Sequence, residues 1–541
     1  MSAPSPTTRP APGTDGPAVV DPRRRTLILA AMCVALVAVV ASVSGLNVAQ
    51  GKLAVDLGAT QSQLLWVING YTIALAALLL PIGAIGDRWG RKPVLVSGLA
   101  LFLGANAVAS LSATVTQLLL ARIAAGVGAA MIMPVTLSVI TSTFPAEDRD
   151  RAVGVWAGFA GAGGILGLVG SSLVVDHLTW PWVFAGPIAL GAVALVMAVA
   201  VVPHSREHAE GRFDTVGSIL SALAVGGVVL GVHEGPEHGW SAPLTVVGLA
   251  VGLVAAVAFV AWELRQDHPL LALRVFRDRT LAAGSASLLV TFAVMGALFL
   301  VLVQFLQAVL GYSATRAAVS LLPMAAVMMP LSNVAPLIAR RIGLRTILAG
   351  GLLTVAGGLA LMALLADPTG GYLSIVPGLF VLSVGIGLTM TPGTSAITGS
   401  LPPEEQGVAS ALNDTVRELG TALGVALIGS VLSAGYSSSI ASATTGLPAD
   451  AARAAKEGIG GAVVVAGQLG PQGEGLMAAA RSAFVDGWTA SMWLSAGLAL
   501  AAAAFAFVWL PRHAPAEAAT TATAEGSTTE AGDADRELVL A

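Results

Sequence analysis

The 26-residue stretch GVASALNDTVRELGTALGVALIGSVL (407–432) combines a long apolar run with two carboxylates, Asp414 and Glu418. A run of this length is sufficient for a helix to cross the ~30 Å hydrocarbon core of a bilayer. In such a helix Asp414 lies roughly 10 Å and Glu418 roughly 16 Å from the start, and both lie on one face because they are four residues apart. An ionisable group at that depth is costly and normally faces water or a partner, so the pair is a candidate functional site.

The rest of the chain repeats this apolar pattern. Of its 541 residues, 55% are hydrophobic and only 11% are charged, whereas about a quarter are charged in ordinary soluble domains. Apolar blocks of about 20 residues predict membrane-spanning helices, which satisfy their backbone polar groups internally. The sequence therefore predicts an all-α polytopic membrane protein. We count fourteen spans in the order six, two, six: 27–47, 62–82, 93–112, 117–140, 152–175, 181–202; 213–232, 243–264; 282–309, 314–338, 346–366, 372–396, 407–432 and 484–510.

The positions of lysine and arginine predict the orientation of these spans. Cytoplasmic segments carry an excess of positive charge, and Arg23, Arg24 and Arg25 precede the first span. Alternate loops are also basic, with Arg88, Arg91, Lys92, Arg149, Arg151, Arg206, Arg212, Arg265, Arg274, Arg277, Arg279, Arg340, Arg341 and Arg345. The opposite loops hold only Lys52, Arg316, Arg453, Lys456 and Arg481. Both termini are therefore expected in the cytoplasm.

The same pattern predicts the domain organisation. We expect disordered cytoplasmic tails at 1–22 and 514–541, because both are rich in alanine, threonine and other small or polar residues. Between them we expect an N-terminal six-helix bundle (23–203), a two-helix insert with cytoplasmic linkers (204–280) and a C-terminal six-helix bundle (281–513). The last bundle includes a long external loop (433–483), in which ADAARAAKEG (449–458) predicts a short helix.

Two motifs combine charged residues with glycines. The loop after the second span reads GAIGDRWGRK (83–92), in which glycines permit close helix approach and Asp87 can cap a neighbouring helix N-terminus. A reduced copy, PLIARRIGLR (336–345), lacks the aspartate, and such paired loops indicate two related halves. The fourth span contains LLARIAAGVGAA (119–130), whose Arg122 must find water, carbonyls or a carboxylate. A purely structural anchor is the alternative for Arg122.

These motifs resemble those of the major facilitator superfamily, G-x-x-x-D-R-x-G-R-K and R-x-x-x-G-x-G, and the arginine of the second is implicated in proton transfer. Three further stretches, FDTVG (213–217), PLLALRVF (269–276) and FLQAVLGYS (305–313), together with the order of spans, are similar to its fourteen-helix drug:H⁺ antiporter family of the EmrB/QacA type. The resemblance covers about residues 25–512 and implies two six-helix bundles with two additional helices between them. It also implies conformational roles for Gly83, Asp87, Arg88, Gly90, Arg91, Lys92, Gly126 and Gly167.

The thirteenth span matches two patterns of that family at once. An arginine common at this place is matched by Arg417, and the acidic pair of pumps that expel quaternary ammonium compounds is matched by Asp414 and Glu418. Because Arg417 at i+3 can pair with Asp414, three interpretations stay open. Both carboxylates take part in cation binding and proton coupling, or only Glu418 stays free, or the group is a self-neutralised structural cluster.

The sequence departs from the family pattern at three places. The fifth span lacks the usual proline of G-P-x-x-G-G, although Gly167 and Gly170 preserve a small-residue surface. Acidic residues of the first and second spans are replaced by Ser42 and Asn69. With two acids missing, a monocationic or neutral amphiphile fits better than a divalent cation.

Candidate cavity-lining residues are aromatic, amide or guanidinium side chains within the spans, because aromatic faces suit flat cations and amides supply adaptable hydrogen bonds. They are Trp66, Asn69, Tyr71, Gln304, Phe305, Gln307, Asn413 and Arg417.

Patterns for other chemistry are missing from the sequence. It contains neither H-E-x-x-H nor G-x-x-x-x-G-K-[ST], so we expect no metal, no cofactor, no ATP-driven step and no enzyme activity. The sequence predicts a monomeric, proton-coupled multidrug efflux transporter of the plasma membrane, exporting amphiphilic monocations by alternating access. Its expected partners are small amphiphiles, H⁺ and the bilayer, and not nucleic acid. The alternatives are a dedicated exporter of one antibiotic or metabolite, or a non-transporting membrane sensor or scaffold.

Overall fold

The computed structural model describes residues 21–203 and 213–511, and every regular element in this part of the chain is helical. It contains 14 helical segments long and apolar enough to cross a membrane, which confirms the number of spans that the sequence predicts. The linker 204–212 and nearly all of both predicted tails lie outside the described residues.

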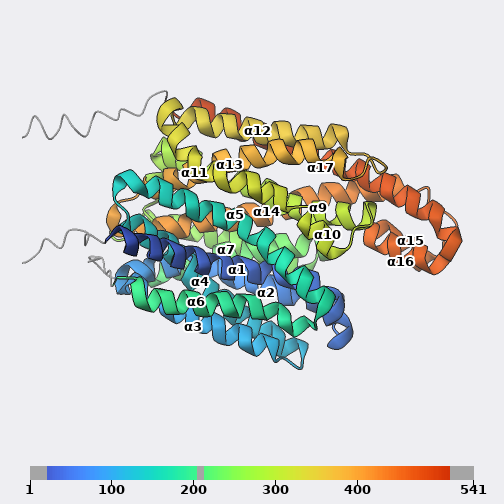
Figure 1. Cartoon of the computed structure of the whole chain (residues 1–541), viewed down its shortest axis with the longest axis horizontal. Coiled ribbons are helices and arrows are strands. Elements are labelled where there is room, and N and C mark those ends of the chain that lie inside the picture. The colour runs from blue at the N-terminus through green and yellow to red at the C-terminus, as the bar shows by residue number, and fades with distance from the viewer. Residues whose placement is uncertain (1–20, 204–212, 512–541) are drawn as a thin grey trace, which may run out of the picture.

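The first six spans pack together as one bundle. Their helices are α1 (Pro22–Asp56), α2 (Gln61–Trp89), α3 (Arg91–Ser110), α4 (Val115–Thr143), α5 (Ala146–His177) and α6 (Ala185–Val201), the last preceded by a 3₁₀ turn (Trp180–Phe184). α1 packs against α5 and α6, and α4 packs against α2 and α3. Figure 1 shows α1, α2, α3, α4 and α6, coloured blue to green, in the lower part of the molecule, with α5 above them.

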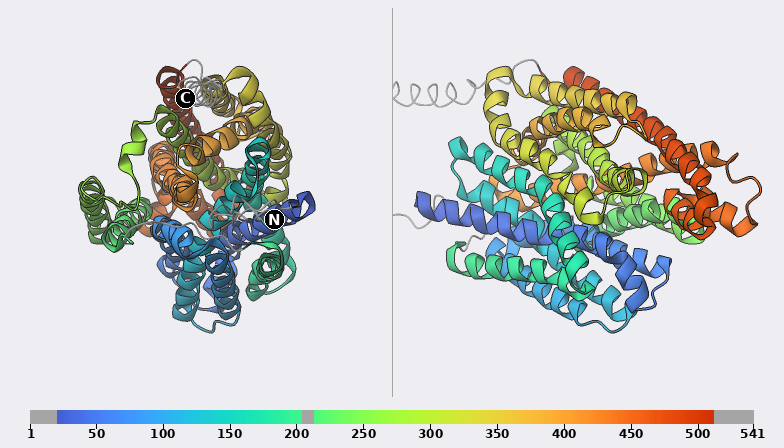
Figure 2. Two further views of the ribbon diagram at one scale, coloured as in Figure 1. Left: turned by 90° about the vertical axis from the view of Figure 1, so that its left-hand side faces the viewer. Right: turned by 45° about the vertical axis from the view of Figure 1, so that its right-hand side comes forward.

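The next two spans form a hairpin beside both bundles. α7 (Thr215–His238) and α8 (Pro243–Glu263) cross where Gly227 and Gly231 face Gly248 and Gly252, and a Cβ added at Gly227 lies only 2.8 Å from the Cα of Gly252. Small residues at this spacing bring two helices into backbone contact inside a membrane. α7 also contacts α2 and α14, whereas α8 packs mainly on α7, so the pair is peripheral, as the left view of Figure 2 shows in green.

The last six spans form the second bundle. They comprise α9 (Arg279–Gln304), α10 (Ala314–Val319) with α11 (Leu322–Ile342), α12 (Leu344–Leu365), α13 (Val376–Thr398), α14 (Gln406–Ile440) and α17 (Glu474–Trp509). α9 packs against α13 and α14, and α12 packs against α13 and α17. The two bundles meet mainly where α5 contacts α11 and where α14 contacts α2 and α4.

The stretch 433–483, which the sequence analysis treats as a loop, is mostly helical. α14 has 35 residues, a length of about 52 Å, so it extends beyond a ~30 Å hydrocarbon layer. It is followed by α15 (Ala449–Glu457), which confirms the predicted short helix, by α16 (Ile459–Leu469) and by the early start of α17. Figure 1 places α15 and α16 beyond the other helices, at the right-hand end.

The two ends of the molecule differ in character. We call the end with the α2–α3 turn and the starts of α5 and α12 the basic end, because the arginine-rich segments gather there. The end that carries α15 and α16 is the hairpin end. The first and last described residues both lie at the basic end.

An aromatic cluster joins α9, α12 and α17 near the hairpin end. Phe305 begins a π-helical turn (Phe305–Val309) after α9, and its ring centroid lies 4.9 Å from that of Trp488 and 6.5 Å from that of Phe484, both in α17. The indole N–H of Trp488 donates a 3.1 Å hydrogen bond to the carbonyl oxygen of Met362 in α12. This buried contact fixes α17 against the two helices.

We expect Trp488→Ala to lower the thermal midpoint of the detergent-solubilised protein by several degrees, because removing a buried tryptophan costs roughly 3–5 kcal/mol. Trp493→Ala, at a tryptophan of the same helix that is 48% exposed, is the matched control and should leave the midpoint nearly unchanged. An equal loss in both variants would contradict the packing role of Trp488.

Candidate functional site

Polar side chains on α14 form a buried group in the middle of the protein. Asn413 and Asp414 are fully buried, and Arg417 is nearly so. Asp414 Oδ1 accepts hydrogen bonds of 3.1 Å from both Asn413 Nδ2 and Arg417 Nη1. Charge-assisted contacts of this kind offset part of the cost of burying both ions, and Asp414 and Arg417 form an ion pair. Asp414 Oδ2 and Arg417 Nε have no hydrogen-bond partner among the described residues.

Arg417 is also enclosed by aromatic rings from two other helices. Its guanidinium carbon lies 4.5 Å from the ring centroid of Phe292 in α9 and 5.3 Å from that of Trp156 in α5. Trp156 is held in turn by a 3.1 Å hydrogen bond from its indole N–H to Thr136 Oγ1 in α4. Since α5 and α4 belong to the first bundle, Arg417 contributes to the packing between the two bundles.

Glu418 lies one turn beyond Asp414 and has a different environment. Its side chain is partly exposed, and within the described residues its carboxylate forms neither a hydrogen bond nor an ion pair. It lies within electrostatic range of Arg417, of Asp414 and of the phenol of Tyr71 in α2. Of the two carboxylates noted in the sequence, Glu418 is the partly exposed one, whereas Asp414 is fully buried.

A second buried network surrounds Arg122 in the first bundle. Arg122 Nη1 donates a 2.9 Å hydrogen bond to Ser42 Oγ in α1, and Ser42 donates at 3.2 Å to Asn106 Oδ1 in α3. The guanidinium stacks over Tyr71, 4.2 Å from the ring centroid, while its Nε and Nη2 atoms have no hydrogen-bond partner among the described residues. A fully buried arginine with spare donors can respond to an anion or to water.

Tyr71 connects the two networks. Its ring contacts Arg122, its phenol is within electrostatic range of Glu418, and its hydroxyl donates a 3.2 Å hydrogen bond to the carbonyl of Val39 in α1. The packing of α14 against α2 and α4 creates this proximity. The arrangement brings the Glu418 carboxylate of α14 near a phenol and a guanidinium inside the first bundle, and such groups are suited to moving or holding a proton.

Asp87 joins the two bundles at the basic end. Its Oδ1 accepts from the backbone N–H of Gly407 at 2.9 Å, and its Oδ2 accepts from that of Val408 at 3.1 Å. A carboxylate at the N-terminus of a long helix is favoured by the unpaired N–H groups and the helix dipole. Arg91 also donates to Asp87 Oδ1, at 3.0 Å, and both side chains are buried. Asp87 thus caps a helix 320 residues away in the chain.

The other residues of the 83–92 motif support this contact. Gly83 allows α2 to approach α14, because a Cβ there lies 2.6 Å from the carbonyl oxygen of Gly407. Gly90 adopts φ 105° in the turn between α2 and α3. Lys92 Nζ donates a 2.8 Å hydrogen bond to the carbonyl of Val199 near the end of α6. Arg88 is partly exposed at the end of α2.

The two remaining glycines of the sequence analysis lie at other helix crossings. Gly126 of α4 packs against the backbone of Tyr71 in α2, which brings Arg122 and Tyr71 together. Gly167 of α5 packs against Ala41 of α1, where an added Cβ lies 2.5 Å from the Ala41 Cα.

The other predicted cavity residues lie in four different settings. Asn69 is buried and Trp66 partly exposed on α2, one and two turns before the helix meets α7 and α14 through Ile73 and Ala76. Gln304 lines a cavity at the hairpin end, far along α9 from the acidic group. Phe305 belongs to the aromatic cluster, and Gln307 is exposed. The structure does not bring these last three residues to Glu418.

Several contacting residues were missed by the sequence analysis. Asp150 in α5 pairs with Arg340 of α11 at 3.2 Å and accepts a 3.2 Å hydrogen bond from Ser395 of α13, so it also joins the bundles at the basic end. The charged residues of EDRDR (147–151) and at 340–341 predict a polar surface. They do not predict which charged residue pairs with which. Nothing in the sequence distinguishes Trp156 and Phe292 from other apolar core residues.

Comparisons with known proteins agree with this architecture. The model of the Major Facilitator Superfamily matches residues 30–425. The multidrug efflux pump LfrA of Mycolicibacterium smegmatis is 33% identical over 486 residues, which cover 89% of this chain and 96% of that protein. The cephamycin export protein CmcT of Amycolatopsis lactamdurans is 33% identical over 420 residues, covering 76% and 86% of the two chains.

Among solved structures, the proton:xylose symporter XylE superposes with a TM-score of 0.59 at 12% identity, covering 91% of this chain and 97% of that chain. At this identity the likeness concerns the fold alone.

We expect Asp87→Asn to open the basic end, because it removes charge-assisted hydrogen bonds worth about 1.5–3 kcal/mol each. Spin labels at Asp148→Cys and Arg341→Cys, on a Cys33→Ser background, report the separation of α5 and α11 by pulsed EPR. The expected result is a new population at longer distance. Glu404→Gln, an exposed acid near the start of α14, is the control. An unchanged distance distribution in Asp87→Asn would show that the contact does not hold the bundles together.

Proposed function

Because the chain belongs to the major facilitator superfamily, we propose that it is a proton-coupled efflux transporter that exports amphiphilic, monocationic compounds by alternating access. The observation that supports this most directly is Glu418, a carboxylate between the bundles without a hydrogen bond or ion pair in the described residues. Efflux is supported by the similarity to LfrA and CmcT over most of their lengths.

Glu418 is the residue to which we assign exchange of proton and substrate. When it is deprotonated, it attracts a cation into the space between the bundles. A proton entering from outside neutralises it and releases the cation outward. Exchange of one H⁺ for one monovalent cation moves no net charge, so the pH gradient drives it. A neutral substrate would also draw on the membrane potential, at about 2.3 kcal/mol per charge per 100 mV.

Asp414 and Arg417 act in this proposal as a fixed neutral pair that holds the position of Glu418. Their mutual hydrogen bond and the aromatic rings around Arg417 support this division of roles. Arg122 and Tyr71 form the opposite wall, where the spare donors of Arg122 stabilise Glu418 or water when the bundles rearrange. Trp66, Asn69 and Asn413 are the remaining residues that we assign to the substrate cavity.

Alternating access then requires the bundles 23–203 and 281–513 to rock against each other, with the insert 204–280 at the side. Asp87, Gly83 and Asp150 hold the basic end closed in the arrangement described. With the arginine-rich end in the cytoplasm of a bacterial plasma membrane, this is a state closed to the inside. A single chain contains both bundles and all the assigned residues, so we propose a monomer.

Export of a single antibiotic or metabolite is the second candidate. The similarity to the cephamycin export protein supports it. The site residues are the same in both cases, and only the range of substrates differs.

Energised cells expressing the protein should expel ethidium, and Glu418→Gln should reduce the initial efflux rate by roughly tenfold or more, a barrier change of about 1.4 kcal/mol per decade. Collapse of the proton gradient should have the same effect on the wild type. Glu404→Gln is the matched control. Wild-type rates in Glu418→Gln would exclude Glu418 as the coupling residue, and no efflux from the wild type would favour the single-substrate candidate.

The double variant Asp414→Asn/Arg417→Gln removes both members of the pair and leaves no uncompensated buried charge. We expect it to retain proton-dependent efflux at a reduced rate, whereas Asp414→Asn alone leaves Arg417 unpaired and should lower the thermal midpoint as well. Loss of proton dependence in the double variant, with the fold intact, would assign coupling to Asp414 and not to Glu418.

Proton exchange is also measurable without a gradient. Adding ethidium to the purified wild type in weakly buffered detergent solution should release protons, detected with a pH indicator, because the cation displaces them from Glu418. Glu418→Gln should bind ethidium without proton release. Equal proton release from both proteins would contradict the assignment.

A further inference from the structure

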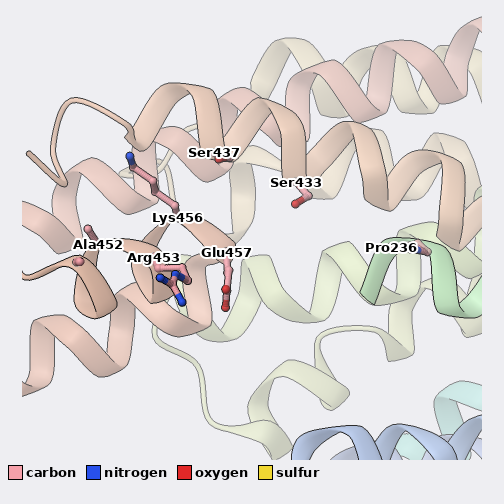
Figure 3. A pocket seen from close by; sticks show the side chains of 8 residues that line it. Pro236, Ser433, Ser437, Ala452, Arg453, Lys456 and Glu457 are labelled. Atoms are coloured by element: carbon pink, nitrogen blue, oxygen red, sulfur yellow. The ribbon is translucent and has the colours of Figure 1, made fainter. Parts of the chain in front are cut away.

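Two adjoining cavities lie at the hairpin end, outside the proposed transport site. The outer one has a volume of about 610 Å³ and the inner one about 230 Å³, and they share Pro236 of α7, Ser433 of α14 and Glu457 of α15. Figure 3 shows the outer cavity, with Ser433 and Ser437 along one helix, Arg453 and Glu457 of α15 below them, and Pro236 on a separate helix to the right. The two cavities therefore adjoin, and we refer to them together as this space.

The outer cavity is lined by charged and hydroxyl side chains. Arg453, Lys456 and Glu457 of α15 lie at spacings of three and four residues, so they occupy one face of the helix, and all three are exposed. Ser433 and Ser437 of α14 line the opposite side, one turn apart. The cavity therefore has a net positive charge together with hydroxyl donors.

The inner cavity is mainly apolar. Val232 of α7, Leu300 of α9, Val425 and Leu432 of α14 and Phe484 of α17 line it. Val425 lies eight residues before Ser433, a depth of about 12 Å along α14. The space therefore runs from a charged mouth near α15 to a mainly apolar region deeper along α14.

The mouth is held in place by a contact between α14 and α15. The Tyr436 hydroxyl, on the wall of the inner cavity, donates a 2.9 Å hydrogen bond to the carbonyl oxygen of Ala455. Ala455 is buried, and it lies between Arg453 and Lys456 in sequence. The backbone that carries the two basic side chains is therefore held against α14.

We propose that this space is a binding site for one membrane phospholipid, with its phosphodiester on Arg453 and Lys456 and the first part of one acyl chain in the inner cavity. The lining of the two cavities matches the two parts of such a molecule. In the outer cavity, cations and hydroxyls bind the phosphate oxygens, and in the inner cavity, apolar side chains contact the acyl chain. Glu457 accepts hydrogen bonds from the ammonium or hydroxyl groups of the headgroup. A monocationic amphiphile fits less well, because Arg453 and Lys456 repel it at the mouth.

A bound phospholipid would connect three parts of the chain: the α7–α8 insert through Pro236, the second bundle through Ser433, and the external helix α15. It would fill the space left at this end between α7 and α14, which pack together nearer the middle through Val229 and Ala426. This inference does not depend on the proposed transport function.

Native mass spectrometry of the delipidated full-length protein tests the proposal, with dioleoyl phosphatidylglycerol, dioleoyl phosphatidylethanolamine, dioleoylglycerol and glycerol 1-phosphate as probes. We expect both phospholipids to form a first 1:1 adduct more tightly than dioleoylglycerol or glycerol 1-phosphate. Arg453→Ala/Lys456→Ala should weaken that adduct roughly tenfold, about 1.4 kcal/mol. Ser433→Trp, which fills the shared region from another helix, should weaken it similarly.

Arg481→Ala, at an exposed arginine of α17 that does not line the cavities, is the matched control and should leave the adduct unchanged. Unchanged thermal midpoints show that the variants are folded. Equal phospholipid binding by the wild type and the double variant would overturn the proposal, as would equally tight binding of dioleoylglycerol or of glycerol 1-phosphate. An ethidium adduct that Ser433→Trp abolishes while phospholipid binding is unaffected would assign the space to exported cations instead.

Discussion

The cost of placing charge in a hydrocarbon layer governs the position of every ionisable group within the spans of this protein. Arg122, Asp414 and Arg417 are all buried between helices, where each has a hydrogen-bond partner or an aromatic ring. Glu418 differs, because it is near these groups but forms neither a hydrogen bond nor an ion pair in the described part of the chain. A group whose charge is incompletely compensated responds readily to a proton or a cation, and our proposal for transport rests on this difference.

α14 links the contact at the basic end to the polar group in the middle of the protein. Its first turn donates two backbone N–H groups to Asp87, and Asp414 and Glu418 follow on the same helix, about 10 Å and 16 Å further along. A helix transmits displacement along its axis because its backbone hydrogen bonds keep it stiff. Movement of α14 away from α2 therefore changes the surroundings of Glu418 as well, and the proposed transport mechanism uses this connection.

The α7–α8 insert and the short helix α15 also contact α14, outside the two bundles. α7 packs on α14 through Val229 and Ala426, and α15 is joined to α14 by the Tyr436 hydrogen bond. Both elements therefore depend on the position of α14. The cavities at the hairpin end lie where these elements diverge, so their shape depends on the same helix as the acidic group does.

Properties that depend on local spacing could be predicted from the sequence. Apolar blocks predict the fourteen spans, and the i, i+4 spacing predicts that Asp414 and Glu418 share one face. The partner of each charged side chain could not be predicted in this way. The sequence allowed Arg417 to pair with Asp414 or to leave it free, and the packing of Phe292 and Trp156 around the guanidinium accompanies the pairing observed. Sequence spacing also does not predict that Asp87 caps a helix 320 residues away, that Asp150 pairs with Arg340, or that Gln304 lines a different cavity. These outcomes depend on how helices that are distant in the chain approach one another, and that geometry is a property of the whole packed bundle.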